Sequence, residues 1–600
     1  MKSKSSLSLL RTVVCVLILL LIPSLLGAFE NGSRMIGLGS WLYDAIDTLY
    51  HESGKVIPFT TRPYTVDEFD LYLGALQHEG LSRAGQELFG RVKSALYPKR
   101  FESSDEQSAF DFSILLSPEL YLNTNKEMVR EEGSQHYIDG YEYGYEQRLP
   151  ILSIPIRFWG GPYLYVEIDF DIKEQPGLGV YPSGTFPSSG DPYVNWNNIP
   201  MGLDHILHHF PDTYYLNFGD LHWNFYIGSG EYSVGTGKTG NLVLSQDADA
   251  IPGIRLSWYN KNFRYNFTYL SLNPAVGNSG AYQVSSVGSG MALDLPALTA
   301  KYNNAAAYGT DYLDYMNPGL YPYKGYLTHT MEFRTLYDLL YIGVTESAVY
   351  GRAVPELFTF MPLAFWHNGN NGQQTNSFLA LDVQISLLNL AQFYFSGVMD
   401  QFTLGHENNT LDPEANGMIV GATGRWPVGK GYVTAAAEYV YTSDWLYTHR
   451  YWMQTPTVAQ RNTALTRGGY TVRMLGYHLG NDYRQIHIDA GYSVPGVFDA
   501  SLGWNIGWKG PYDVFMRLPV QIGETVINLA EGLSDVPEAV INQIALTGHY
   551  RMNDTLSVGA YLYWTFTNNY RNQQGVTNEN LECTLSVQID PIAASKAMKR

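Results

Sequence analysis

Apolar and polar side chains alternate strictly over about nine to twelve residues at a time, and such stretches recur along this 600-residue chain from about residue 108. "QIHIDAGYSV" (485–494) places Ile, Ala, Tyr and Val at every second position, with His, Asp, Gly and Ser between them. "FDASLGWNIGW" (498–508) and "LECTLSVQI" (581–589) repeat the pattern. A period of two is that of a β-strand with two unlike faces, and this length suffices to cross a bilayer at a tilt.

The aromatic content helps to decide which class of β protein this is. The chain holds 47 Tyr, 26 Phe and 12 Trp, which make 14% of its residues, whereas only 16% are charged. Two classes fit: a large soluble β protein, and an outer-membrane β-barrel with aromatic girdles at both membrane interfaces. Strands of a β-sandwich are usually nearer five or six residues, so the longer alternating stretches favour the barrel.

We therefore predict an all-β fold, a transmembrane antiparallel β-barrel of about 18 strands with 16–20 possible. Short turns are expected at "YNKN" (259–262), "GKG" (429–431) and "MND" (552–554). Long connections are expected at 174–213, 273–325, 403–415, 444–467 and 523–543. Short turns at one end and long loops at the other are typical of outer-membrane barrels.

The N-terminal segment predicts export. Residues 1–28 combine a basic start, an apolar run over 12–26 and a small-residue cleavage point near Ala28, which is the pattern of a secretory signal peptide. An uncleaved membrane anchor is the alternative, but the apolar run is shorter than the ~20 residues of a spanning helix. We expect the protein in the cell outer membrane, in contact with its lipid and inserted by the outer-membrane barrel assembly machinery.

Residues 35–100 have a helical period instead. Leu42, Ala45, Ile46 and Leu49 form one apolar stripe, and "TVDE" (65–68) has the form of a capping box. A third helix is expected around 82–96. The predicted organisation is a signal peptide (1–28), a helical domain, periplasmic or plugging (29–105), the barrel (106–590) and a short tail (591–600).

Charge and cysteine content exclude several classes. The net charge is −19, and residues 1–28 hold three basic and no acidic residues, so the remainder is more negative still. Nucleic acid is therefore an improbable partner, because phosphate contact needs a basic surface. Apart from Cys15 in the signal peptide the chain has only Cys583, which allows neither an intrachain disulfide nor a cysteine metal cluster.

The stretch "VGTGKTGNLVLS" (234–245) ends a Walker A pattern at Gly237-Lys238-Thr239. That pattern needs a glycine five positions before Gly237, where Tyr232 stands, and a helix directly after the threonine. "GNLVLS" begins with a glycine and becomes strand-like. We expect a glycine-rich turn and no bound nucleotide.

Several segments, in order, resemble the Wzi-type capsule-assembly proteins over about residues 39–589. They are "LGSWLYDAIDTLY…TTRPYTVDEF", "GSGEYSVGTGKTGNLVLSQDADAIPGIRLSWY", "LTHTMEFRTLYDLLYIGVTESAVYG", "FTFMPLAFWHN…NSFLALDVQI…FSGVMDQF", "AEYVYTSDWLYTHRYW" and "LGYHLGNDYRQI". This family consists of outer-membrane β-barrel lectins with an N-terminal helical region. The resemblance implies that fold, and the binding or retention of a surface polysaccharide.

Five charged residues fall within the family pattern, and the resemblance implies a pore-plug or glycan-contacting role for some of them: Glu332, Arg334, Glu346, Asp382 and Glu438. All except Glu346 share the polar phase of their strands and are expected in the lumen. Glu346 shares the phase of apolar neighbours, so its direction is less clear. The alternative, which we favour, is a lumen network of ion pairs that fixes strand register.

Aromatic side chains in the expected long loops suit sugar rings, which have an apolar face and a rim of hydroxyls. "SDWLYTHRYW" (443–452) supplies Trp445, Tyr447, Tyr451 and Trp452 as a candidate sugar platform. Ordinary packing at the membrane interface is the alternative, since Tyr and Trp also concentrate there.

Three functions remain open at this stage. The first is a barrel that holds a surface polysaccharide, the second is a porin-like channel for small solutes, and the third is a secreted polysaccharide-active β enzyme. The sequence has neither a G-x-S-x-G elbow nor a diagnostic carboxylate pair. We expect a protein that is not an enzyme and that uses neither a cofactor nor a metal.

Overall fold

The computed structural model describes most of the chain after residue 30. The described ranges are 31–97, 101–102, 108–124, 148–173, 197–200, 213–246, 250–272, 323–352, 375–401, 413–449, 454–461, 470–512, 520–522, 525–527, 532–553 and 555–592, with single residues at 206, 211, 361, 366 and 514.

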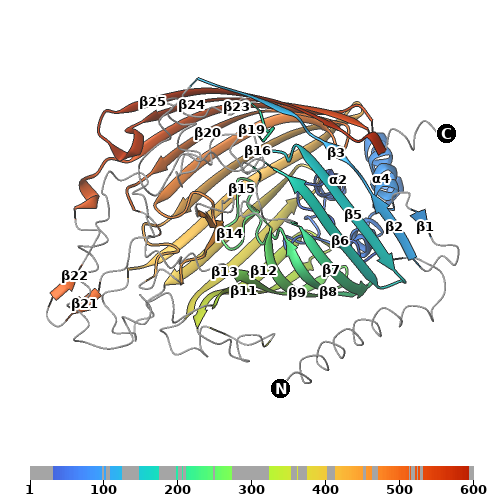
Figure 1. Ribbon diagram of the computed structural model, residues 1–600, viewed down its shortest axis with the longest axis horizontal. Helices are drawn as coiled ribbons and strands as arrows, with labels where there is room; N and C mark the ends of the chain where they lie inside the picture. The colour runs from blue at the N-terminus through green and yellow to red at the C-terminus, as the bar shows by residue number, and fades with distance from the viewer. Residues whose placement is uncertain are drawn as a thin grey trace, which may run out of the picture.

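The described strands form a closed antiparallel β-barrel, which Figure 1 shows from the side. Its first strand is broken into β2 (Ser108–Phe112), β3 (Leu115–Leu116) and β4 (Glu119–Asn123). The others are β5 (Leu152–Gly160), β6 (Leu164–Ile172), β7 (Tyr214–Asp220), β8 (Trp223–Gly230), β9 (Ile251–Tyr259), β10 (Phe263–Leu272), β11 (Tyr323–Thr335), β12 (Leu340–Arg352), β13 (Thr375–Leu387), β14 (Ala391–Gln401), β15 (Ala415–Val428), β16 (Gly431–Thr442), β19 (Tyr483–Val494), β20 (Phe498–Lys509), β23 (Ala539–Arg551), β24 (Leu556–Asn568) and β25 (Thr577–Ile589). The barrel closes where β25 pairs with β3 and β4. Eighteen strands surround the lumen, as the sequence predicts.

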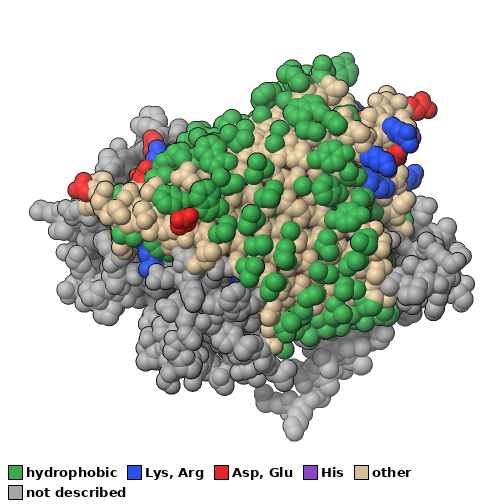
Figure 2. Space-filling model, turned by 90° about the horizontal axis from the view of Figure 1, so that it is seen from above, with side chains coloured by type: hydrophobic (Ala, Val, Ile, Leu, Met, Phe, Trp, Pro, Cys, Tyr) green, Lys and Arg blue, Asp and Glu red, His purple; other side chains and the backbone are tan. Residues whose placement is uncertain are grey.

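The two faces of the strands differ as the alternation predicts. Trp504 and Ile544 lie opposite each other on β20 and β23 and are 42% and 43% exposed on the outer wall. Their neighbours Asn505 and Gln543 face inward and hydrogen bond at 3.0 Å. Figure 2 shows hydrophobic side chains spread over the outer wall, which is the surface that meets lipid in such a barrel.

The two ends of the barrel also differ. At the end that we name the turn end, successive strands are joined by two to four residues, as at 260–262, 336–339 and 429–430. The predicted short turns are confirmed. The opposite end, the loop end, carries the longer connections, and most residues of the predicted long connections lie outside the described ranges. Two small sheets lie within these connections, β17 (Thr457–Arg461) with β18 (Tyr470–Met474) and β21 (Val520–Ile522) with β22 (Thr525–Ile527).

In the described part of the chain, three α-helices precede the barrel, α2 (Trp41–Glu52), α3 (Val66–Leu73) and α4 (Arg83–Leu96). The capping box of α3 forms as predicted, with the Thr65 hydroxyl on the Glu68 N–H and the Glu68 carboxylate on the Thr65 N–H. One short strand follows these helices, β1 (Phe101–Glu102), and it pairs with β2. None of the helices that the structure describes is both long and apolar enough to span a membrane.

The helical segment, residues 31–97, docks on the turn end of the barrel, and we name it the helical plug. The Val56 N–H donates to the Asp338 carbonyl in the turn between β11 and β12 at 2.8 Å. Gln392 Nε2 on β14 donates to the Lys55 carbonyl at 2.6 Å. These contacts place the plug against the inner wall, so the lumen is covered at this end.

Candidate functional site

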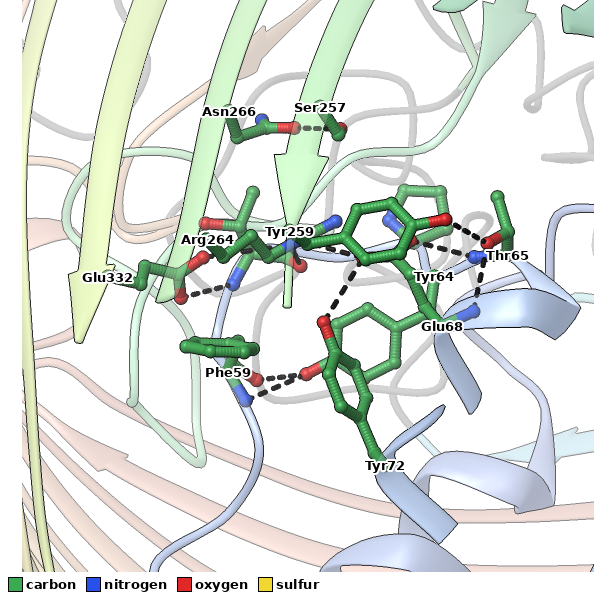
Figure 3. A network of polar contacts seen from close by, with 12 residues as sticks. Phe59, Tyr64, Thr65, Glu68, Tyr72, Ser257, Tyr259, Arg264, Asn266 and Glu332 are labelled. Atoms are coloured by element: carbon green, nitrogen blue, oxygen red, sulfur yellow. Dashed lines mark hydrogen bonds and ion pairs between the residues drawn. The ribbon is translucent and has the colours of Figure 1, made fainter. Parts of the chain in front are cut away.

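A buried ionic cluster joins the helical plug to the wall (Figure 3). Arg264 on β10 lies between Glu68 of α3, at 2.9 Å, and Glu332 of β11, at 3.6 Å. Glu332 also accepts hydrogen bonds from the backbone N–H groups of Thr60 and Thr61, at 2.7 and 3.1 Å. The Arg264 and Glu332 side chains are fully buried, so this pair tethers the plug instead of facing an open pore.

Arg334 lies nearer the turn end and belongs to a second tether. Its guanidinium pairs with Asp338 at 3.0 Å and donates to the Lys261 carbonyl at 3.0 Å. Asp338 also pairs with Lys55 of the plug at 3.1 Å. Arg334 therefore links two turns of the barrel with the plug.

The connection between β8 and β9 folds into the lumen, and we name residues 231–246 the infolded connection. The Glu438 carboxylate on β16 accepts the backbone N–H groups of Lys238 and Thr239 at 2.6 and 3.0 Å. It also accepts the Thr239 hydroxyl, and the hydroxyl of Tyr394 at 2.8 Å. In a phosphate-binding loop such N–H groups face an anionic ligand. Here a carboxylate of the barrel wall takes that position.

Other contacts hold the infolded connection across the lumen. The Tyr326 hydroxyl donates to the Val243 carbonyl at 2.6 Å, and Lys238 Nζ pairs with Asp489 at 2.9 Å. The Arg62 N–H donates to the Ser233 carbonyl at 2.8 Å, which joins this connection to the helical plug. The sequence predicts a turn at this place, and the structure adds that the turn folds into the lumen, where its partners come from distant strands.

Of the remaining two charged residues of the family pattern, Asp382 lies beside Thr236 of the infolded connection, whereas Glu346 lies apart from these contacts. Asp382 on β13 faces the lumen and is 1% exposed, opposite Gly343 of β12. Glu346 faces the outer wall, because it shares the phase of Val344, which is 42% exposed there. Its carboxylate lies 2.9 Å from His329 Nε2, and the His329 ring stacks on Trp366 at 4.6 Å. The five residues thus occupy several places in the barrel and do not form one site.

The proposed sugar platform is described only in part, since Tyr451 and Trp452 lie outside the described residues. Trp445 is partly exposed and meets Tyr512 edge-on at 5.3 Å. Tyr447 is buried, and its hydroxyl donates to the Leu242 carbonyl of the infolded connection at 2.7 Å. Trp445 is thus the more exposed of the two described residues of this group.

A polar cavity of about 300 Å³ lies between the helical plug, the infolded connection and the wall. Its lining is mostly amides, hydroxyls and basic side chains, among them Arg62, Lys238, Gln384, Gln392, Tyr394 and Arg425. None of these residues was predicted as a site residue. They come from segments up to several hundred residues apart, and only the docking of the plug brings them together. Among the described residues, no group of His, Cys, Asp and Glu side chains could hold a metal ion.

Comparison with solved structures supports the fold. A structure described as Wzi, an outer-membrane protein involved in group 1 capsule assembly in Escherichia coli and a carbohydrate-binding β-barrel, aligns over 92% of this chain and 99% of its own, with a TM-score of 0.54 and 14% identity. OprD and OccD3 of Pseudomonas aeruginosa align over 82% and 80% of this chain and 95% and 91% of their own, each with a TM-score of 0.38 and 10% identity. No family model and no curated protein matches the sequence. At these identities the likeness is one of fold.

Proposed function

We propose that this protein is an outer-membrane barrel that binds or retains a surface polysaccharide at its loop end. The observation that carries the proposal is a lumen obstructed by two parts of the same chain. The helical plug covers the turn end through Arg264 and Glu332, and the infolded connection crosses the lumen at Glu438. A barrel obstructed in this way leaves its loop end as the surface available to a large ligand.

A carbohydrate ligand is supported by two further observations. The solved structure with the highest TM-score given above is described as a carbohydrate-binding barrel involved in capsule assembly. The partly exposed Trp445 ring lies in a connection at the loop end, and aromatic faces suit the apolar face of a sugar.

The porin-like channel is the alternative function, and conductance separates the two. We expect the purified protein in planar bilayers to show no large steady single-channel steps, since the plug and the infolded connection obstruct the lumen. Binding of the purified surface polysaccharide of the producing cell to the detergent-solubilised protein is measured in parallel. Large steady steps without polysaccharide binding would overturn the proposal in favour of a channel.

Trp445→Ala tests the loop-end contact. One lost aromatic contact is worth about 1 kcal/mol, so we expect polysaccharide binding to weaken about fivefold. Trp258→Ala is the matched control, because Trp258 is 60% exposed on the outer wall beside the turn end. Equal binding by the two variants would remove Trp445 from the site.

A further inference from the structure

The cavity between the helical plug and the infolded connection has the composition of a ligand site instead of a packing defect. Packing defects in protein interiors are small and apolar, whereas this cavity of about 300 Å³ is lined largely by polar side chains. Its volume lies at the lower end of the ~300–1,000 Å³ range of small-molecule sites. A ligand of about one sugar ring fits that size.

The basic side chains of the lining are already neutralised. Arg62 pairs with Asp47 at 2.8 Å, Lys238 pairs with Asp489 at 2.9 Å, and Arg425 pairs with Asp44. An anionic ligand would have to compete with these carboxylates for the same cations. The charge balance therefore favours an uncharged ligand.

The carboxylates orient the guanidinium groups of Arg62 and Arg425, but they do not use all of the N–H donors of these groups. In the described part of the chain, the side-chain hydrogen bonds of Arg62 all use Nη2, and those of Arg425 all use Nη1. The other N–H groups of both side chains remain as donors. A hydroxyl oxygen can accept from such donors without any change in net charge.

The wall of the cavity supplies an acceptor as well. Gln384 on β13 is 5% exposed, and its Oε1 has no hydrogen-bond partner among the described residues. A buried acceptor without a partner is destabilising, so a ligand that donates a hydrogen bond to it gains affinity. A carboxylate cannot donate, whereas a sugar hydroxyl can both donate and accept.

We propose that this cavity binds a neutral, polyhydroxylated solute of monosaccharide size. Its hydroxyl groups accept from Arg62 and Arg425 and donate to Gln384, and the Tyr394 ring lies beside it in the same lining. The volume of about 300 Å³ accommodates about one sugar ring, so the site takes a free small sugar. This site is separate from the loop-end contact proposed above, and either proposal stands if the other fails.

Equilibrium dialysis of the full mature protein in detergent tests the proposal, with labelled D-glucose, D-galactose and D-mannose as probes and D-glucuronate and acetate as charged comparators. Overnight equilibration gives the solute time to reach the cavity. We expect at least one neutral sugar to bind more tightly than glucuronate, and acetate not to compete with it. Failure of all three neutral sugars to bind, or tighter binding of glucuronate, would overturn the proposal.

Gln384→Ala should weaken sugar binding about tenfold, the effect of losing about 1.4 kcal/mol from a buried hydrogen bond. Gln573→Ala is the matched control, because Gln573 is exposed at the loop end between β24 and β25. Should Gln384→Ala fail to fold, Thr423→Val in the same lining replaces it, with the same expected loss. A folded lining variant that binds the sugar as tightly as Gln573→Ala would refute the site, whereas unchanged polysaccharide binding at the loop end would show that the two sites are distinct.

Discussion

Arg264 is the residue on which the docking of the helical plug depends most directly. Its buried guanidinium lies between Glu68 and Glu332, and its centre lies 5.2 Å from the Tyr64 ring centroid. Replacing it by an apolar side chain leaves two buried carboxylates without their cation. The loss of one member of a buried ion pair costs about 3–5 kcal/mol.

Arg264→Met should therefore loosen the plug while the barrel persists. We expect hydrogen exchange in the helices at 41–96 to accelerate about a hundredfold or more, as 3 kcal/mol implies. Arg484→Met is the control, because Arg484 pairs with Glu538 where both side chains are 44% exposed, and such pairs contribute at most about 1 kcal/mol. The same exchange rates in both variants would contradict the proposed role of Arg264.

His51 makes the plug sensitive to acid. The ring is fully buried at the end of α2, and burial lowers the pKa of His51 to about 4. The unfolded helix, with an ordinary histidine pKa of about 6.5, takes up a proton before the folded one does as the pH falls. Stability that is present above pH 6.5 is thus lost between pH 6.5 and about 4, by up to about 3 kcal/mol.

The measurement is hydrogen exchange of the α2 peptide at pH 7 and pH 4.5, corrected for the intrinsic exchange rate. We expect protection of this helix to fall at pH 4.5 in the wild type. In His51→Leu the fall should be smaller, since the leucine side chain cannot take up a proton. An equal fall in both proteins would assign the acid sensitivity to other groups.

At the scale of elements, the infolded connection depends on one carboxylate of the wall. Glu438 accepts two backbone N–H groups and two hydroxyls, and hydrogen bonds to a charged acceptor contribute more than neutral ones. Without it, the N–H groups of Lys238 and Thr239 lose their acceptor inside the lumen. The infolded connection should then move out of the lumen more often.

Glu438→Ala is expected to give brief, flickering current steps in planar bilayers, with the plug still limiting their size. Glu414→Ala is the control, because Glu414 is exposed directly before β15. This variant should show no current steps. If Glu438→Ala shows no more current steps than the control, the infolded connection is held by its other contacts, such as the hydrogen bond from Tyr326 to Val243.

The same elements show what a sequence can predict. The capping box at Thr65 and Glu68 and the alternation of β20 depend on neighbours within a few residues, so both are visible in the sequence. The contact of Lys238 with Glu438 joins residues 200 positions apart, and no local sequence pattern predicts it. Glu346 likewise matched the family pattern, but the phase of its strand turns it to the outer wall beside His329. Strand direction follows from period, whereas partners across the lumen follow from the closed barrel.

At the scale of the whole molecule, the protein consists of a closed barrel wall and of two segments inside it, the helical plug and the infolded connection. Each strand of the barrel pairs with both neighbours, and the broken first strand does so in parts, through β2 and β3 to β5 and through β3 and β4 to β25. The plug and the infolded connection contribute no strand to this ring. Loss of their contacts should therefore open the lumen without opening the wall.

The last prediction tests whether the barrel wall is stable independently of the helical plug. A closed barrel has no free strand edge at which it can begin to unfold in detergent, because each backbone group is paired within the ring. We expect the wild-type protein to show mainly β-sheet circular dichroism with a minor helical part, and to migrate faster on gels before boiling than after. Arg264→Met should show the same shift, since Arg264 contacts the plug with its side chain and the ladder with its backbone. Identical migration of boiled and unboiled wild type would contradict a closed barrel, and loss of the shift in Arg264→Met alone would mean that the plug supports the wall.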